Sequence, residues 1–200
     1  MSANTYLTDG ERAALESAIV GIAGAGGLGS NCASHLVRAG VRRFVIADFD
    51  VVSESNLNRQ FYFRDQVGMK KVEALAVNLR RIEPDVELTL ACERLDAARS
   101  RELFADCDVV VEAFDSADAK SMLLAAMMPT GKRIVTASGM AGWGRSNEMR
   151  VRMIGPRVVA VGDGESAVGV AGAAPHSPRV GIASAMEANA AVALLLGREP

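Results

Sequence analysis

Residues 17–48 read SAIVGIAGAGGLGSNCASHLVRAGVRRFVIAD, and this stretch decides the fold. The run at 17–23 is short and apolar, so it predicts a buried strand that enters a tight glycine turn. Apolar residues spaced three to four apart predict a helix over 28–39, which Gly40 ends. A second strand is expected at 43–48, joined to the first by a right-handed parallel crossover.

The same alternation of strands and helices continues along the chain. The further elements expected are helices over 68–81, 117–128 and 180–196, and strands at 86–91, 107–113, 133–137, 148–154 and 157–161. The last two strands adjoin without a helix between them, which indicates an antiparallel pair. The pattern predicts an α/β, Rossmann-like fold: a mostly parallel sheet with helices on both faces and an antiparallel C-terminal extension.

Length and composition favour one globular domain over residues 1–200, with an N-terminal helical segment at 1–16. Residues 162–178 are rich in Gly, Ala and Ser and are expected to form a flexible crossover loop. The net charge of −2 gives no broad basic surface, so nucleic acid is not an expected partner. No leader peptide or membrane span is indicated, so a cytoplasmic location without a membrane partner is expected.

Gly24, Gly26 and Gly29 form the pattern G-x-G-x-x-G between a predicted strand and a predicted helix. Glycine lets the backbone turn sharply and approach a phosphate, which the helix N-terminus can then hold. Asp48 ends the second strand, about twenty residues further on, where an acid can accept hydrogen bonds from ribose hydroxyls. The motif predicts a bound nucleotide but leaves NAD, FAD and ATP open.

Residues downstream of Asp48 favour a triphosphate. Asn56, Arg59 and Lys71 follow the second strand, and Asp115 follows the strand CDVVVEA. Ligand groups gather at such strand ends in open α/β sheets. Two cations and one carboxylate suit a triphosphate that carries magnesium, whereas neither tyrosine begins the Tyr-x-x-x-Lys motif of short-chain dehydrogenases.

Five separated blocks occur in a recognisable order: AGAGGLGSN, DFDVVSESNLNRQ, VGMKKVEAL, VVVEAFDSADAK and ASGMAGWG. From residue 17 to 197 the chain resembles the ThiF family, short type, within the ubiquitin-activating-enzyme (E1)-like MoeB-ThiF superfamily. The resemblance implies a nucleotidyltransferase that uses ATP and Mg²⁺. It would adenylate the C-terminal glycine of the ubiquitin-like sulfur carrier protein ThiS in thiamine biosynthesis, and it would act as a homodimer.

The resemblance also assigns roles to individual residues. It places Gly27 beneath the phosphates with the motif glycines, Asp48 on the ribose, and Asn56 and Arg59 on the triphosphate. Lys71 would hold the α-phosphate region. Asp115 matches the family's magnesium-binding aspartate, and Ser116 takes the second position of the family's Asp-Asn pair, where the chain departs from the pattern.

Further departures concern metals, sulfur and the dimer. Cys32, Cys92 and Cys107 include no CxxC pair, so no disulfide framework and no zinc site are predicted. No cysteine follows Cys107, so the reaction is expected to stop at the acyl adenylate. Arg12 is the candidate for the arginine that relatives lend to a neighbouring subunit.

Other interpretations remain open. The same chemistry could serve a different carrier or a small carboxylate, and a NAD-binding oxidoreductase or sensor would use only the glycine turn and Asp48. A catalytically silent binding module would require a broken cation set, which the sequence does not show. Asp115 could also cap the following helix, and Asp50 is interpreted as a turn or capping residue. Trp143 either shapes a channel or packs, and His35 and His176 are assigned no chemistry.

Overall fold

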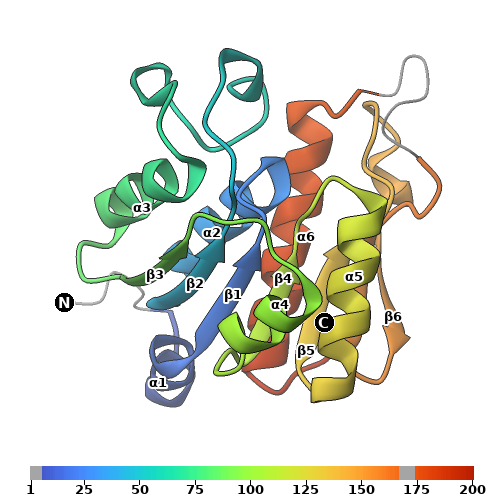
Figure 1. The fold of residues 1–200 in the computed structure, drawn as a ribbon. Helices are drawn as coiled ribbons and strands as arrows, with labels where there is room; N and C mark the ends of the chain where they lie inside the picture. The colour runs from blue at the N-terminus through green and yellow to red at the C-terminus, as the bar shows by residue number, and fades with distance from the viewer. Residues whose placement is uncertain (1–5, 167–173) are drawn as a thin grey trace.

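The computed structural model describes residues 6–166 and 174–200 (Figure 1). The α-helices are α1 (Asp9–Ser17), α2 (Gly27–Ala39), α3 (Lys71–Ile82), α4 (Ala97–Leu103), α5 (Ala117–Met127) and α6 (Ser177–Leu195). The strands are β1 (Ile19–Ala23), β2 (Arg43–Ala47), β3 (Glu87–Ala91), β4 (Val109–Glu112), β5 (Arg133–Ala137), β6 (Arg150–Gly155) and β7 (Val158–Gly162). Short 3-10 helices are η1 (Glu54–Asn56), η2 (Arg64–Gln66), η3 (Met128–Thr130) and η4 (Ser146–Glu148).

The strands form a seven-stranded sheet in the order β3-β2-β1-β4-β5-β7-β6. Every neighbouring pair is parallel except β6 with β7, which is antiparallel. The predicted parallel sheet with an antiparallel C-terminal extension is therefore confirmed. Because the chain runs outward from β1 to β3 and then returns to β4, the strand order reverses between β1 and β4. In open α/β sheets, ligands bind at the carboxyl ends of strands beside such a reversal.

Helices cover both faces of the sheet, as predicted (Figure 1). On one face, α2 and α6 pack against each other, and Leu36 and Ala190 lie in one buried apolar cluster with the central strands. On the other face, α4 and α5 enclose a second cluster around Phe104, Leu123 and Met127. A parallel sheet is stabilised by burying apolar surface on both of its faces.

Helix α4 connects β3 to β4 and was not expected from the sequence. Its first turn is capped by Asp96, whose carboxylate accepts a hydrogen bond from Arg99 N at 2.8 Å. The segment AARSREL carries too few apolar residues to show a helical period. A crossover between parallel strands usually contains a helix, so the sheet topology accounts for α4 where the local pattern does not.

Helix α6 begins earlier than the sequence indicated. It starts at Ser177 instead of residue 180, because Pro178 fits the first turn of a helix, where its missing N–H is not needed. The loop predicted at 162–178 is therefore shortened at both ends, since Gly162 still belongs to β7. Residues 167–173 of that loop lie outside the described residues. Over residues 6–166 and 174–200, none of the helices combines the length and apolar character needed to cross a membrane.

Candidate functional site

The glycine turn connects β1 to α2, and each motif glycine meets a different steric constraint. Gly24 has a φ of +99°, which favours glycine, and an added Cβ would lie 2.7 Å from Ala113 O. A Cβ on Gly29 would come within 1.8 Å of the Gly24 carbonyl oxygen, so α2 packs this closely only with glycine there. At Gly26 an added Cβ would meet only Gln60 Nε2, at 3.9 Å, so this backbone is open to a ligand. These are the three roles that a nucleotide-binding glycine turn requires.

The first turn of α2 faces the same opening. Its N-cap residue is Gly26, which has no side chain to accept hydrogen bonds from the first N–H groups. Those groups lack intrahelical partners, and the helix dipole adds partial positive charge. The N-terminus of α2 is therefore suited to hold a phosphate. Gly27, the first residue of α2, lies beside Arg59, whose Cγ would be 3.6 Å from an added Cβ.

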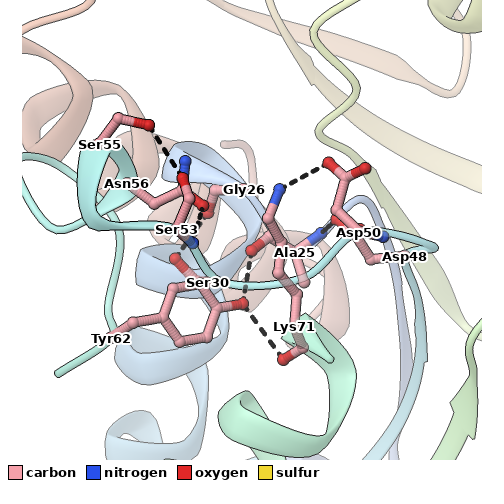
Figure 2. A network of polar contacts seen from close by, with 10 residues as sticks. All are labelled: Ala25, Gly26, Ser30, Asp48, Asp50, Ser53, Ser55, Asn56, Tyr62 and Lys71. Atoms are coloured by element: carbon pink, nitrogen blue, oxygen red, sulfur yellow. Dashed lines mark hydrogen bonds and ion pairs between the residues drawn. The ribbon is translucent and has the colours of Figure 1, made fainter. Parts of the chain in front are cut away.

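Asp48 follows β2 and is hydrogen-bonded to the glycine turn. Its Oδ2 accepts a hydrogen bond from Ala25 N at 2.7 Å, and its Oδ1 accepts one from Asp50 N at 2.8 Å (Figure 2). The residue is buried, so these bonds fix the carboxylate in one orientation. A carboxylate can accept about four hydrogen bonds, which leaves capacity for hydroxyl donors such as those of a ribose.

Lys71 begins α3 and carries a buried ammonium group. Its Nζ lies 2.8 Å from Asp50 Oδ2, and its backbone N donates to Asp50 O at 2.9 Å. Lysine is rarely buried unless it is paired, so Asp50 stabilises the ammonium in this position. Asp50, expected as a turn or capping residue, is instead the counter-ion of Lys71, and α3 begins without a side-chain cap.

Asn56 and Arg59 lie in the segment that folds back over α2. Asn56 Oδ1 accepts a hydrogen bond from Ser53 N at 3.0 Å, which shapes η1. The Arg59 backbone is fixed to α2 because Asn31 Nδ2 donates to its carbonyl oxygen at 2.9 Å. The Arg59 guanidinium donates to Ser55 O at 3.2 Å. Arg59 is therefore held beside the α2 N-terminus, whereas Asn56 already uses its carbonyl oxygen in a turn.

Tyr62 links the glycine turn to α3, a role that was missed from the sequence. Its hydroxyl donates to Ala25 O at 2.6 Å and to Lys71 O at 3.3 Å (Figure 2). Burial, with a smaller effect of the nearby Asp48 carboxylate, raises the pKa of Tyr62, so the phenol remains a neutral donor. A buried tyrosine usually finds a hydrogen-bond partner for its hydroxyl, but the sequence does not say which one.

Asp115 and Ser116 follow β4 and are exposed. Ser116 is the N-cap of α5, since its Oγ accepts a hydrogen bond from Ala119 N at 3.3 Å. The capping role considered for Asp115 therefore belongs to Ser116. The loop lies against the glycine turn through the contact of Ala113 with Gly24. Throughout the part of the chain that the structure describes, no cluster of three or more His, Cys, Asp or Glu residues is placed to hold a metal ion.

Glu112 is fully buried beneath this loop, at the end of β4. Its Oε1 accepts a hydrogen bond from Phe114 N at 2.9 Å, and its Oε2 contacts Lys120 Nζ and the Thr136 hydroxyl. The buried carboxylate therefore fixes the backbone immediately before Asp115. This residue was not singled out from the sequence, because a glutamate at the end of an apolar run looks like the end of a strand.

The structure brings the glycine turn, Asp48, Arg59 and Lys71 together at the carboxyl ends of the central strands, with Asp115 on the adjoining loop. Arg12 does not belong to this group within the chain. It lies on α1, which is placed at the opposite end of the strands (Figure 1), and its Nη1 is 3.3 Å from Asp9 Oδ1.

A buried ion pair fixes the ends of the predicted crossover loop. Arg179 of α6 pairs with Asp163, both side chains are 3% exposed, and Arg179 Nη1 donates to Gly144 O at 2.6 Å. Burial acts to raise the pKa of Asp163, but hydrogen bonds from Ser166, Glu165 and Arg179 outweigh it and lower that pKa to about 2. Neither Asp163 nor Arg179 was identified from the sequence, because the two residues lie 16 positions apart and no local pattern links them.

Trp143 lies on the outside of this region. It is 67% exposed, and its ring centroid is 4.7 Å from that of His176 in an edge-to-face contact. Trp143 therefore packs on a loop residue and not in the core. Its alternative role, shaping a channel, stays a prediction.

The three cysteines are free thiols in the structure. Cys32 and Cys107 are buried, and burial raises the pKa of Cys32 and brings that of Cys107 to about 12. Only thiolates react readily, so these two positions are unsuited to sulfur chemistry. Cys92 is exposed at the end of β3.

The strand order, the glycine turn between β1 and α2 and the acid after β2 define an α/β protein of the Rossmann-like class. Residues 3–200 match the ThiF family, and the chain belongs to that family. The family resemblance inferred from the five sequence blocks is therefore confirmed.

Curated relatives include several adenylyltransferases. The molybdopterin-synthase adenylyltransferase of Escherichia coli is 31% identical over 192 residues, which are 94% of this chain and 77% of that protein. The sulfur carrier protein ThiS adenylyltransferase of the same organism is 33% identical over 138 residues, 68% of this chain and 55% of that protein. The adenylyltransferase and sulfurtransferase UBA4 of Candida glabrata is 35% identical over 143 residues, 71% of this chain but only 33% of that protein.

Solved structures share the fold. TcdA (CsdL) superposes with a TM-score of 0.85 at 22% identity, over 94% of this chain and 90% of that one. A complex of Escherichia coli TcdA, a tRNA N6-threonylcarbamoyladenosine dehydratase, with AMP gives the same values. Escherichia coli MccB, with AMPCPP and MccA, has a TM-score of 0.74 at 20% identity, over 95% of this chain and 59% of that one. At these identities the likeness concerns the fold alone.

Proposed function

We propose that this protein uses ATP to adenylate the C-terminal carboxylate of a small ubiquitin-like sulfur carrier protein. The observation that carries the proposal is the buried ammonium of Lys71, which is paired with Asp50, while the Lys71 backbone carbonyl is hydrogen-bonded to Tyr62, which also contacts the glycine turn. A dinucleotide pyrophosphate needs only the backbone turn, whereas transfer from a triphosphate also needs fixed cations. The adenylyltransferase relatives support the same activity.

The proposed reaction is attack of a carboxylate oxygen of the carrier on the α-phosphorus of ATP. A bond forms between these two atoms, the bond from the α-phosphorus to the bridging oxygen breaks, and pyrophosphate leaves with the electron pair. A C-terminal carboxylate has a reference pKa of about 3.5, so it is ionised at neutral pH and no general base is needed. Negative charge grows on the phosphoryl oxygens, so the protein contributes positioning and positive charge.

Each site residue has a part in this proposal. The glycine turn and the N-terminus of α2 bind the phosphates, and Asp48 accepts hydrogen bonds from the ribose. Lys71 offsets the charge at the α-phosphate. Arg59, beside the N-terminus of α2, binds the pyrophosphate portion as it departs, with Asn56 at the edge of the same segment.

We assign Asp115 the role of holding a magnesium ion. Mg²⁺ commonly takes one or two protein carboxylates together with substrate phosphates and water. A single exposed carboxylate on a loop that touches the glycine turn fits that requirement, and Ser116 fixes the loop by capping α5. The ion, when bound, would neutralise charge on the polyphosphate.

The finer proposal is that the carrier is ThiS and that the reaction belongs to thiamine biosynthesis. It rests on the short ThiF pattern of the sequence blocks. The test is a panel of purified carriers, ThiS beside the carrier of molybdopterin synthase, in an ATP–pyrophosphate exchange assay. The highest kcat/KM is expected with ThiS. A preference for the other carrier would support the adenylation reaction but contradict the assignment to thiamine biosynthesis.

We also propose that the protein is a homodimer. Because Arg12 lies at the opposite end of the strands from the glycine turn, it could reach a nucleotide only in a second copy of the chain. Sedimentation equilibrium is expected to give twice the mass of the chain, and a monomer at all concentrations would overturn this proposal.

Two neighbouring lysines provide a sharp test of the activity. Lys71→Ala should lower ATP–pyrophosphate exchange by about 100-fold or more, the size expected when one group that stabilises developing charge is removed. Lys70→Ala is the matched control, since Lys70 is exposed and pairs only loosely with Glu73, at 3.5 Å. The control should retain full exchange. No exchange with any carrier, despite ATP binding, would contradict the proposed function, as would tight NADH binding without ATP binding.

A further inference from the structure

The Tyr62 hydroxyl holds the carbonyl oxygen of Ala25, inside the glycine turn. It donates a hydrogen bond to Ala25 O at 2.6 Å and lies 3.3 Å from Lys71 O (Figure 2). A phenol carries one hydrogen, so the shorter contact is the main hydrogen bond. Both Ala25 and Tyr62 are buried, and among the described residues no other group donates to the Ala25 carbonyl. The orientation of this carbonyl therefore depends on one hydroxyl group.

The Ala25 carbonyl belongs to the same peptide group as the N–H of Gly26. The described part of the chain has no cis peptide bond, and in a planar trans peptide the C=O and the N–H point in opposite directions. Since the carbonyl points to Tyr62, the Gly26 N–H points away from it. This N–H has no hydrogen-bond partner among the described residues, and an added Cβ on Gly26 would meet only Gln60, at 3.9 Å. The Gly26 N–H is therefore a free donor beside open space.

The peptide group on the other side of Gly26 is held by the same segment of chain. Ser30 Oγ donates to Gly26 O at 2.6 Å and accepts a hydrogen bond from Phe61 N at 3.0 Å. The Phe61 carbonyl is in turn fixed to α3, because Asn78 Nδ2 donates to it at 2.7 Å. Phe61 and Tyr62 thus contact both peptide groups that flank Gly26, the first through Ser30 and the second directly.

The Tyr62 hydroxyl also relates the glycine turn to Lys71. Lys71 is the first residue of α3, and its carbonyl oxygen lies 3.3 Å from the hydroxyl. Its ammonium group extends from the same residue and is paired with Asp50. In the proposed reaction, the Gly26 N–H and the Lys71 ammonium both act on the polyphosphate. One phenol contacts the backbone that carries each of these two groups.

We propose that Tyr62 is a positioning residue for the polyphosphate of the nucleotide: its hydroxyl aims the Gly26 N–H at the phosphates and fixes the spacing between this donor and Lys71. This inference rests on the proposed function and adds a residue that does not itself touch the nucleotide. A donor that is oriented before the ligand arrives costs little reorganisation on binding. Loss of the hydroxyl should therefore weaken the contacts with phosphates and leave the contacts with the ribose unchanged.

The experiment is isothermal titration calorimetry of the full chain with ATP, with inorganic tripolyphosphate and with adenosine, which has no phosphate. Tyr62→Phe keeps the ring and removes only the hydroxyl. The variant should bind ATP and tripolyphosphate about tenfold more weakly, the size expected for one hydrogen bond to a charged group, and should bind adenosine as the wild type does. In ATP–pyrophosphate exchange, its KM for ATP should rise by a similar factor, while its KM for the carrier stays unchanged.

A second measurement follows the Gly26 amide directly and does not depend on any variant. In the wild type, the ¹H–¹⁵N resonance of Gly26 should move downfield when tripolyphosphate binds, because its N–H gains an acceptor. In Tyr62→Phe the same resonance should move less. A change that only loosened the fold would not act selectively on this resonance.

Two controls separate positioning from loss of stability. Tyr6→Phe removes the same hydroxyl from a side chain that is 96% exposed. Val41→Ala opens a cavity in the same apolar cluster as Tyr62, but between α2 and β2, at the amino end of that strand. Val41→Ala should lower the free energy of unfolding. Both controls should bind all three ligands as the wild type does.

The outcomes separate this inference from the proposed function. Equal weakening of ATP and adenosine binding in Tyr62→Phe would overturn the inference, because the hydroxyl would then only stabilise the fold. Unchanged affinity for ATP and tripolyphosphate, or a wild-type Gly26 resonance that ignores tripolyphosphate, would overturn it as well and leave the proposed function intact. Absence of exchange with any carrier, in a wild type whose Gly26 amide responds to tripolyphosphate, would overturn the proposed function alone.

Discussion

Gly26 and Gly29 belong to one motif, but a methyl group would have opposite consequences at the two positions. At Gly29 it would meet the Gly24 carbonyl oxygen at 1.8 Å, inside the contact between α2 and the turn after β1. At Gly26 it would meet no atom closer than 3.9 Å. Gly29 is therefore required by packing, and Gly26 only by whatever occupies the open space.

Substitution by alanine separates these two requirements. Gly29→Ala should lower the free energy of unfolding by at least about 3 kcal/mol, because α2 must move away from β1. Gly26→Ala should change the free energy of unfolding by less than about 1 kcal/mol but weaken ATP binding, because its methyl group stands where a phosphate approaches. Urea denaturation and calorimetry measure the two effects. Equal losses of stability, or unimpaired ATP binding by Gly26→Ala, would contradict this assignment.

At the scale of elements, the sequence pattern predicted the helices and strands that carry a clear apolar period of their own. Strand β1, helix α2 and the turn between them carry a clear apolar period and glycine signal, and they lie where they were expected. Helix α4 was missed because its short charged segment has no such period, and the start of α6 was placed late because its first turn contains a proline. Both elements depend on the connections that the sheet imposes.

The link between β7 and α6 depends on the pair Asp163 and Arg179. Asp163→Asn should lower the free energy of unfolding by about 3 kcal/mol, because it leaves the buried Arg179 without a counter-ion. Asp9→Asn is the control: Asp9 also pairs with an arginine, but its side chain is 98% exposed, and a loss below about 1 kcal/mol is expected. Similar losses in the two variants, measured by urea denaturation, would show that the buried pair contributes no more to the free energy of unfolding than the exposed pair.

At the scale of the whole molecule, the sequence predicted which residues converge but not what holds them. Asp48, Arg59 and Lys71 lie in recognisable blocks, and the sheet order brings those blocks to one edge. The contacts that fix them come from residues without a local signal, such as Tyr62 and Glu112. Their partners are distant in sequence, so these contacts exist only in the folded chain.

The pH dependence of overall stability should show the effect of Glu187 on α6. This glutamate is fully buried, and its two carboxylate oxygens have no hydrogen-bond partner among the described residues. Burial, together with the Glu112 carboxylate and against the opposing effect of Lys120, raises the pKa of Glu187. The folded state therefore keeps a proton that the unfolded state loses at a pH above about 4.3.

The sign of the effect follows from this difference. As the pH rises above about 4.3 toward the raised folded pKa, the free energy of unfolding should fall by up to about 1.4 kcal/mol per pH unit. Glu187→Gln cannot lose a proton, so its stability relative to the wild type should increase between pH 5 and pH 7. Glu199→Gln, at an exposed position, should follow the wild-type curve. Parallel curves for Glu187→Gln and the wild type, by urea denaturation at several pH values, would refute the assignment.

The contact between Lys71 and Asp50 also affects how an anion enters the site. In the proposed reaction, an incoming polyphosphate would compete with this carboxylate for the ammonium, because Asp50 already pairs with Lys71. A single small anion would gain less there than at an unpaired lysine, because Asp50 already offsets the charge of the ammonium. A ligand with several phosphates would compete more strongly than a single small anion, and Asp50 would pair with the lysine again once the ligand had left.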